Sequence, residues 1–426
     1  PTTPIDPDIR LFKMLIHCWI IHSRGSMMIL SANWRDARVQ ISLKSNCLTI
    51  GIEQPHGTDV VSYDFAGRLW SAFLNGVAYR RGLDGKLLAK WRSGCRERRW
   101  LTGEDALRIE QQAHDLVTRL YEDIRSGELS QKLPALAHAV FERILAFDVE
   151  RSKADAQRFH QIYHPIGILP PDQYMAVVLQ MTEGCSFNTC TFCDFYKERP
   201  FRVKSPDEFR AHALAVRDFL GDGLSLRRGI FLGDANALVL PMRRLLPLID
   251  IVHEVYNVDA LGGMYAFLDG FSGEKKSQAN YRALAERGLK RVYIGMESGS
   301  AELLRFLNKP GKPEDVAQTV RALKGAGVAV GVIVLLGAGG EQYADRHVRE
   351  TIDLLNTMPL DGDDILYFSE LIVHERLPYA RHAVDAGILP LSSDGCHAQG
   401  EAIEAGLRFQ SKRPRISRYD IHEFIY

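Results

Sequence analysis

Three cysteines in one short segment are the residues of this chain whose types and spacing indicate chemistry. They are Cys185, Cys190 and Cys193, which lie within nine residues as C-x4-C-x2-C. Thiolates at this spacing converge when a metal centre holds them, and the candidate centres are zinc and an iron–sulfur cluster. A structural zinc site needs four ligands, and no fourth cysteine or histidine lies nearby. Three thiolates on a four-iron cluster leave one iron open to a substrate or cofactor.

The same segment resembles the radical S-adenosylmethionine (radical SAM) superfamily. The likeness lies in the three cysteines, in Phe192 directly before the last of them, and in the strand that ends at residues 180–184. In that family such a loop follows the first barrel strand and holds a [4Fe–4S] cluster whose fourth iron binds SAM. The resemblance therefore implies a cluster on these cysteines and SAM as the second cofactor. One extra residue separates the first two cysteines relative to the commonest family spacing, and this leaves the subfamily open.

Two further motifs of the family are matched where expected strands end. Gly233 and Asp234 follow the second strand and resemble the family turn that holds the amino group of SAM, although the next two residues depart from it. A Gly–Asp turn after a strand is also common in any α/β protein. After the fifth strand, Gly337 resembles the glycine that lies beside the adenine of SAM.

The fourth strand ends in Gly-Met-Glu-Ser-Gly-Ser, which contains Glu297 and Ser298. A helix cap is one interpretation, because Ser300 is a good N-cap with Glu302 in the first turn. The resemblance implies a further role, because family enzymes place such a run beside the ribose and methionine of SAM. An acid projecting above an apolar strand also needs a partner.

The elements around these motifs predict an α/β fold. From residue 174, strands alternate with helices, which indicates a parallel sheet with right-handed crossovers. The strands are expected at residues 174–181, 229–232, 261–267, 291–296, 329–336 and 365–371. Their number equals that of the partial (β/α)6 barrel that the radical SAM resemblance implies. Chemistry is expected at the carboxyl ends of the strands, where the cysteines lie.

The first part of the chain has a different pattern. Short alternating runs separated by turn dipeptides predict a small antiparallel β-meander, and helical spacing follows it. We therefore predict four segments: a β domain at residues 1–104, a helical connector at 105–170, the barrel at 171–386, and a C-terminal tail at 387–426 that packs on the barrel. Residues 79–100 are basic with interleaved aromatics. We favour a solvated hairpin face there, so nucleic acid is a possible but not favoured partner.

Composition limits the function classes. The chain has 426 residues, 46% of them apolar, and equal numbers of basic and acidic side chains, 53 of each. No global charge directs it to nucleic acid, and no segment is apolar and long enough to span a membrane. Seven cysteines, three of them clustered, are typical of intracellular thiols, so we expect a cytoplasmic protein.

We therefore predict an enzyme that cleaves SAM reductively on one [4Fe–4S] cluster. The resemblance implies a 5′-deoxyadenosyl radical that abstracts hydrogen from an unidentified substrate, a small molecule or RNA. It also implies an electron donor such as flavodoxin or ferredoxin. One alternative is a non-enzymatic iron–sulfur or zinc module. Another is a methylthiotransferase-like enzyme with a second cluster on Cys18, Cys47 and Cys95. A role for Cys396 is left open.

Overall fold

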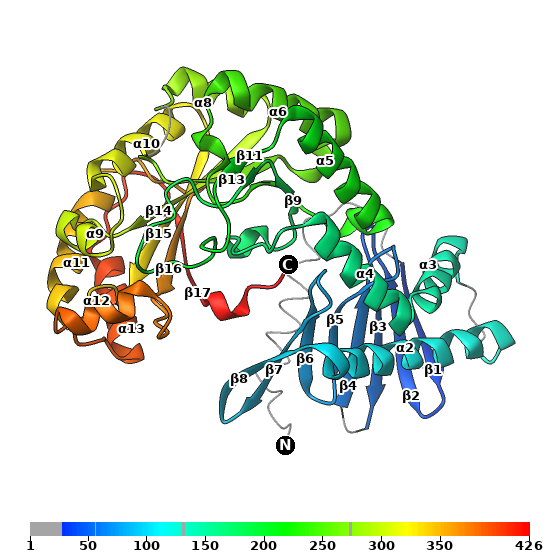
Figure 1. The fold of residues 1–426 in the computed structure, drawn as a ribbon. Coiled ribbons are helices and arrows are strands. Elements are labelled where there is room, and N and C mark those ends of the chain that lie inside the picture. Colours follow the sequence, from blue (N-terminus) through cyan, green and yellow to red (C-terminus); the bar gives the residue numbers. More distant parts are fainter. Residues whose placement is uncertain (1–27, 56, 130–132, 272–274) are drawn as a thin grey trace. The chain divides into compact units, whose positions relative to one another are not determined.

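The computed structural model describes residues 28–55, 57–129, 133–271 and 275–426. Within these residues the chain folds into two compact units (Figure 1). The first comprises the described part of residues 1–156 together with residues 221–226. The second comprises residues 157–220 and 227–426. Each unit has a sheet of its own.

An eight-stranded antiparallel sheet forms most of the first unit, and its strands pair in chain order. Buried apolar side chains lie opposite each other across the strands, as in the pairs Val39–Ile52 and Ile41–Ile50. This arrangement follows from alternation, because every second side chain of a strand faces the same side of the sheet. The strands are β1 (Met28–Trp34), β2 (Ala37–Leu43), β3 (Leu48–Gln54), β4 (Gly57–Tyr63), β5 (Leu69–Leu74), β6 (Val77–Arg81), β7 (Leu87–Ser93) and β8 (Cys95–Leu101).

Two helices complete the core of this unit. They are α2 (Gly103–Ser126) and α3 (Ala135–Ala146), and Val117, Leu120 and Phe141 from them are fully buried against the sheet. The arrangement differs from the predicted connector at residues 105–170, because the apolar faces of α2 and α3 belong to this core. The boundary between the two units lies inside α4 (Val149–Ile162), after residue 156.

The predicted antiparallel meander is confirmed. It has two further strands, β1 and β8, that we did not predict. β8 has the sequence CRERRWL and is largely exposed, so it lacks the alternation that indicates a half-buried strand.

In the basic segment, Arg81 is buried and lies 3.0 Å from Glu110 of α2. It also donates to Ser152 of α4 at 2.7 Å. Arg81 therefore serves the core of the unit and not a solvated hairpin face.

A parallel sheet of seven strands forms the second unit, in the order β17-β16-β15-β14-β13-β12-β9. Figure 1 shows the helices on the outer side of this curved sheet, which confirms the predicted partial barrel. The strands are β9 (Val177–Gln180), β12 (Ile230–Gly233), β13 (Met264–Leu268), β14 (Leu289–Glu297), β15 (Ala329–Leu336), β16 (Ile365–Glu370) and β17 (Arg415–Tyr419). The helices are α5 (Pro206–Leu220), α6 (Met242–Val255), α7 (Val258–Leu261), α8 (Gln278–Glu286), α9 (Ala301–Phe306), α10 (Pro313–Gly325), α11 (Gly340–Leu355), α12 (Pro378–Asp385) and α13 (Ser393–Gly406).

The seventh strand comes from the C-terminal tail, for which we predicted only packing against the barrel. β17 pairs in parallel with β16, and Ile365 lies opposite Arg415. The sequence RISRY is polar at most positions, as is typical of the outermost strand of a sheet. In the described parts of the chain, no helix combines the length and the apolar character needed to cross a bilayer.

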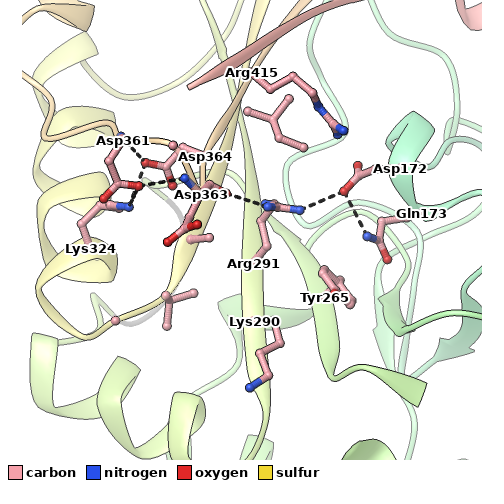
Figure 2. A pocket seen from close by; sticks show the side chains of 15 residues that line it. Asp172, Gln173, Tyr265, Lys290, Arg291, Lys324, Asp361, Asp363, Asp364 and Arg415 are labelled. Atoms are coloured by element: carbon pink, nitrogen blue, oxygen red, sulfur yellow. Dashed lines mark hydrogen bonds and ion pairs between the residues drawn. The ribbon is translucent and has the colours of Figure 1, made fainter. Parts of the chain in front are cut away.

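At the amino-terminal ends of the strands, charged side chains line a pocket of about 770 Å³ (Figure 2). Asp172 is the centre of one network there. Its Oδ2 accepts hydrogen bonds from Arg291 at 3.0 Å and from Tyr293 at 2.6 Å, while its Oδ1 accepts one from Tyr367 at 2.6 Å. One carboxylate thus joins β14 and β16. This is the end of the barrel that serves stability in such folds, opposite the end that carries the cysteines.

Side chains also satisfy the outer edge of β9, which is the last strand of the sheet. The Val178 N–H donates to the Tyr426 hydroxyl at 2.9 Å, and the Tyr163 hydroxyl donates to the Val178 carbonyl at 3.0 Å. The Gln180 N–H donates to His212 Nε2 at 3.0 Å. An open strand edge invites unwanted pairing, and these contacts close it.

Acidification should destabilise the second unit through two buried histidines. Burial lowers the pKa of His212 and of His347 to about 4. The pKa of an unfolded histidine is about 6.5, so between pH 6.5 and pH 4 the unfolded chain binds more protons. The free energy of unfolding is therefore full above about pH 6.5 and falls as the pH decreases. We expect a loss on the order of 2 kcal/mol per histidine at pH 5, measurable by urea unfolding.

The variant His212→Gln is the matched control for this pH dependence. Its amide oxygen can still accept the Gln180 N–H, but it does not titrate. We expect the loss of stability between pH 7 and pH 5 to shrink by about half relative to the unmodified chain. An unchanged pH dependence in this variant would contradict the assignment to His212.

Candidate active site

The three cysteines lie on the loop between the short strands β10 (Thr182–Glu183) and β11 (Arg202–Val203), at the carboxyl end of the parallel sheet. Backbone contacts tie the middle of this loop to other elements. The Thr191 N–H donates to the Leu307 carbonyl at 3.0 Å, and the Thr191 carbonyl accepts from the Tyr379 N–H at 3.0 Å. Asn308 Nδ2 donates to the Thr189 carbonyl at 2.8 Å. The ends of α9 and α12 thereby hold the loop.

Phe192 contributes an apolar anchor to the same loop. Its side chain packs against a small core that contains Leu303, Leu335 and Tyr379. The aromatic residue that we predicted beside the cofactor therefore also joins the loop to α9, β15 and α12.

The cysteine thiols fit an iron–sulfur cluster better than a single zinc ion. All three are free and half-buried. Burial, with a smaller contribution from the neighbouring Cys185, raises the pKa of Cys190 to about 11 and that of Cys193 to about 12. Among the described residues, no three His, Cys, Asp or Glu side chains meet closely enough to hold one metal ion. Thiolates around a four-iron cluster stand farther apart than the ligands of one ion, so this wider spacing is compatible with a cluster.

An acid and a base lie beside this loop. Glu297 ends β14 with a left-handed backbone (φ 60°), and the residue is buried. Its Oε1 lies 2.9 Å from Lys309 Nζ. Burial alone would lower the pKa of Lys309, but the Glu297 carboxylate raises it above its ordinary value. The same ammonium group opposes the effect of burial on the pKa of Cys190.

The turn after Glu297 is held from behind by α11. Ser298 Oγ lies 2.7 Å from His347 Nδ1, and both side chains are fully buried. The Gly299 N–H donates to Thr351 Oγ1 at 2.9 Å. The Ser298 hydroxyl, which we predicted to contact the cofactor, is thus engaged inside the protein and supports the position of Glu297.

The predicted Gly–Asp turn is also engaged inside the protein. Gly233 pairs with Gln180 across the sheet, and its carbonyl accepts from Thr182 Oγ1 at 3.1 Å. Asp234 is 4% exposed. Its Oδ1 accepts from Gln180 Nε2 at 2.7 Å and its Oδ2 accepts from the Gly184 N–H at 2.9 Å.

The C-terminal tail approaches Gly337, which we predicted on the adenine side of SAM. The Gly337 N–H donates to Gln399 Oε1 at 2.8 Å, and a Cβ on this glycine would lie 2.8 Å from Cys396 Sγ. Gly337 also has a left-handed backbone, with φ 77°. Both the close approach of α13 and this conformation favour glycine here.

The structure therefore places one predicted site residue, Glu297, beside the cysteine loop. It engages Ser298 and Asp234 in hydrogen bonds inside the protein. Glu297 pairs with Lys309, and the preceding Asn308 donates to the Thr189 carbonyl on the cysteine loop, so the pair lies near that loop.

Gln180 and Lys309 are site residues that sequence reasoning missed. A polar residue at the end of the apolar run VVLQ was the available signal for Gln180. No feature of the sequence pointed to Lys309, because a lysine after a short helix is ordinarily solvated.

Cys47 and Cys95 cannot share a second cluster. Cys47 lies in the β2–β3 connection, and Cys95 is the first residue of β8, directly after the β7–β8 turn. In a meander these two turns fall at opposite ends of the sheet, and β3 and β7 are four strands apart, about 19 Å. Cys18, the third cysteine of that alternative, lies outside the described residues.

Residues 179–355 match the family model described as the radical SAM superfamily. Residues 179–355 are therefore a radical SAM domain. The cofactors of this superfamily are a [4Fe–4S] cluster and SAM, as we predicted. The match begins at Leu179, one residue before the end of β9, and it includes the cysteine loop and Glu297.

Solved radical SAM structures resemble the chain distantly. The cobalamin-dependent SAM radical enzyme OxsB shares 16% identity over 55% of this chain and 31% of its own, with a TM-score of 0.37. Coproporphyrinogen III oxidase HemN from Escherichia coli shares 14% identity over 54% of this chain and 51% of its own, with a TM-score of 0.41. The chain thus spans less than two thirds of either protein. No curated protein matched the chain.

Proposed function

We propose that this chain cleaves SAM reductively on one [4Fe–4S] cluster held by Cys185, Cys190 and Cys193. The observation that carries the proposal is the set of three free, half-buried thiols at the carboxyl end of a radical SAM sheet. A reduced cluster held by these thiols would supply one electron to the sulfonium of SAM, and would thereby release methionine and a 5′-deoxyadenosyl group able to abstract hydrogen. We expect the substrate to be a small molecule or an RNA.

The pair Glu297 and Lys309 is suited to the methionine part of SAM. That part carries an ammonium and a carboxylate, and an acid and a base held 2.9 Å apart beside the cysteine loop have the complementary charges. Both side chains are about one tenth exposed, and a charge-assisted hydrogen bond is strongest where water is excluded. Gly337, Ser298 and Gly233 then support this site through the backbone positions described above.

The remaining partners follow from the chemistry of the reaction. Radical SAM enzymes typically need a reductant, and we propose a small electron-transfer protein such as flavodoxin or ferredoxin. Cys47 and Cys95 take no part in this scheme, so it contains no second cluster.

Anaerobic reconstitution tests the proposal. We expect about four irons per chain and a broad absorbance near 400 nm. With dithionite as reductant, the loaded protein should convert SAM into methionine and 5′-deoxyadenosine in equal amounts. The matched control is the same protein without reductant, which should release neither product. One bound zinc ion without colour, and no cleavage of SAM, would overturn the proposal in favour of a binding module.

A further inference from the structure

Two buried polar side chains connect the first two barrel strands directly beneath the cysteine loop. Gln180 ends β9 and is fully buried, while Asp234 follows β12 and is 4% exposed. Gln180 Nε2 donates to Asp234 Oδ1 at 2.7 Å. A carboxylate this deeply buried requires hydrogen-bond partners, because its desolvation is costly. Its partners therefore indicate what the group does.

The polar ends of both side chains are bound within this chain. Gln180 Oε1 accepts from the His164 N–H at 3.1 Å, and Nε2 also donates to the His164 carbonyl at 3.2 Å. These two bonds determine which end of the Gln180 amide faces Asp234. The Asp234 Oδ2 accepts from the Gly184 N–H at 2.9 Å, and Arg199 Nη2 lies 3.5 Å from it.

Asp234 thereby holds both ends of the cysteine loop. Gly184 is the residue directly before Cys185, and Arg199 is the sixth residue after Cys193. The two ends also approach each other, because a Cβ on Gly184 would lie 2.9 Å from the Pro200 carbonyl oxygen. The left-handed backbone of Gly184, with φ 75°, orients its N–H in this tight closure.

We infer that Asp234 is a positioning residue that keeps the cysteine loop closed around its cluster, oriented by Gln180, and that it is not a ligand of the SAM amino group. This replaces the role that we predicted for Asp234 from the family resemblance. It rests on the proposed assignment of the cluster to Cys185, Cys190 and Cys193. The two carboxylate oxygens already accept two hydrogen bonds and form one ion pair within this chain, so the group acts through the loop.

The variant Asp234→Asn tests the inference. An asparagine cannot accept from both Gln180 and the Gly184 N–H, because one end of its side chain is a donor. After anaerobic reconstitution, we expect an iron chelator to remove iron on the order of ten-fold faster than from the unmodified protein. In the iron-loaded fraction, the Kd for SAM should stay within about two-fold, because no SAM contact is lost.

The double variant Gln180→Glu with Asp234→Asn is the matched rescue. The new carboxylate at position 180 would accept from the new amide at position 234 and from the His164 N–H, while only the weaker donation to the His164 carbonyl at 3.2 Å would be lost. The amide oxygen at position 234 would then be free to accept the Gly184 N–H again. We expect the rate of iron loss to return to within about three-fold of the unmodified protein. A general loss of stability in Asp234→Asn would not be corrected by placing the carboxylate at position 180, on the neighbouring strand. Should Asp234→Asn fail to fold, Arg199→Gln offers the same comparison at the other end of the loop.

Two results would overturn the inference. One is iron loss at the unmodified rate in Asp234→Asn. The other is a SAM Kd that rises about ten-fold or more at equal iron content, which would assign Asp234 to SAM after all. Failure of the proposed function is distinguishable, because the unmodified protein itself would then hold no cluster.

Discussion

Single replacement of Cys185, Cys190 or Cys193 by alanine should lower the iron content from about four per chain to near zero and abolish cleavage of SAM. Each of these thiols is free and half-buried on the same loop, and a four-iron cluster with only two protein thiolates is rarely retained. Iron content, the absorbance near 400 nm and the yield of 5′-deoxyadenosine measure the effect. We expect at least a hundred-fold loss of product, because electron transfer to SAM requires the cluster, which makes this the largest effect of any change discussed (about 3 kcal/mol or more).

Cys47→Ala and Cys95→Ala are the matched controls for the cluster. They lie at opposite ends of the first sheet, so we expect unchanged iron content and unchanged cleavage of SAM. Loss of iron in either control would contradict the assignment of the iron to the cysteine loop alone.

The second large effect is expected at the buried pair Glu297 and Lys309. Glu297→Gln removes the charge that Lys309 pairs with at 2.9 Å. We expect the Kd for SAM to rise on the order of ten-fold or more while the iron content stays the same, because a charge-assisted contact to the methionine part is lost. Titration of the reconstituted protein with SAM, followed by spectroscopy of the cluster, measures the Kd.

The Glu297→Gln variant is also expected to be less stable, so its stability is measured separately from its affinity for SAM. Removing one partner of a buried ion pair costs on the order of 3–5 kcal/mol, because the other charge is left unpaired. The double variant Glu297→Gln with Lys309→Met removes both charges, so we expect most of the lost stability to return while the SAM affinity remains weak. A double variant that binds SAM as tightly as the unmodified protein would rule out both side chains as ligands.

Local patterns in the sequence were sufficient for the class of fold and for a metal centre, whereas SAM was implied only by the family resemblance. Alternation of apolar residues indicated the meander, and the repeat of strand and helix indicated the parallel sheet, because these periods reflect which face of each element is buried. The C-x4-C-x2-C spacing indicated the metal centre for a similar reason. Ligands that are close in sequence on one loop can converge on one centre, although contacts from distant segments hold this loop in place.

Such local patterns did not predict the contacts between segments that are distant in the sequence. β17 joins the sheet although its sequence RISRY carries little apolar alternation. Its place as an outermost strand depends on the free edge of β16 and not on a propensity of its own. Likewise, α2 and α3 showed helical periodicity, but only the core that they share with the meander assigned them to the first unit.

For individual polar residues, the sequence predicted their positions, but the structure decided their partners. The chain order alone placed Cys185, Asp234 and Glu297 at the carboxyl ends of parallel strands, because all such ends lie on one side of a sheet. What each side chain does there depends on its partners. The tertiary structure binds Asp234 to Gln180 and Gly184, and it brings Lys309 to Glu297 from a position twelve residues later. Hydrogen bonds and ion pairs are made by atoms a few ångströms apart, and only the folded chain decides which atoms those are.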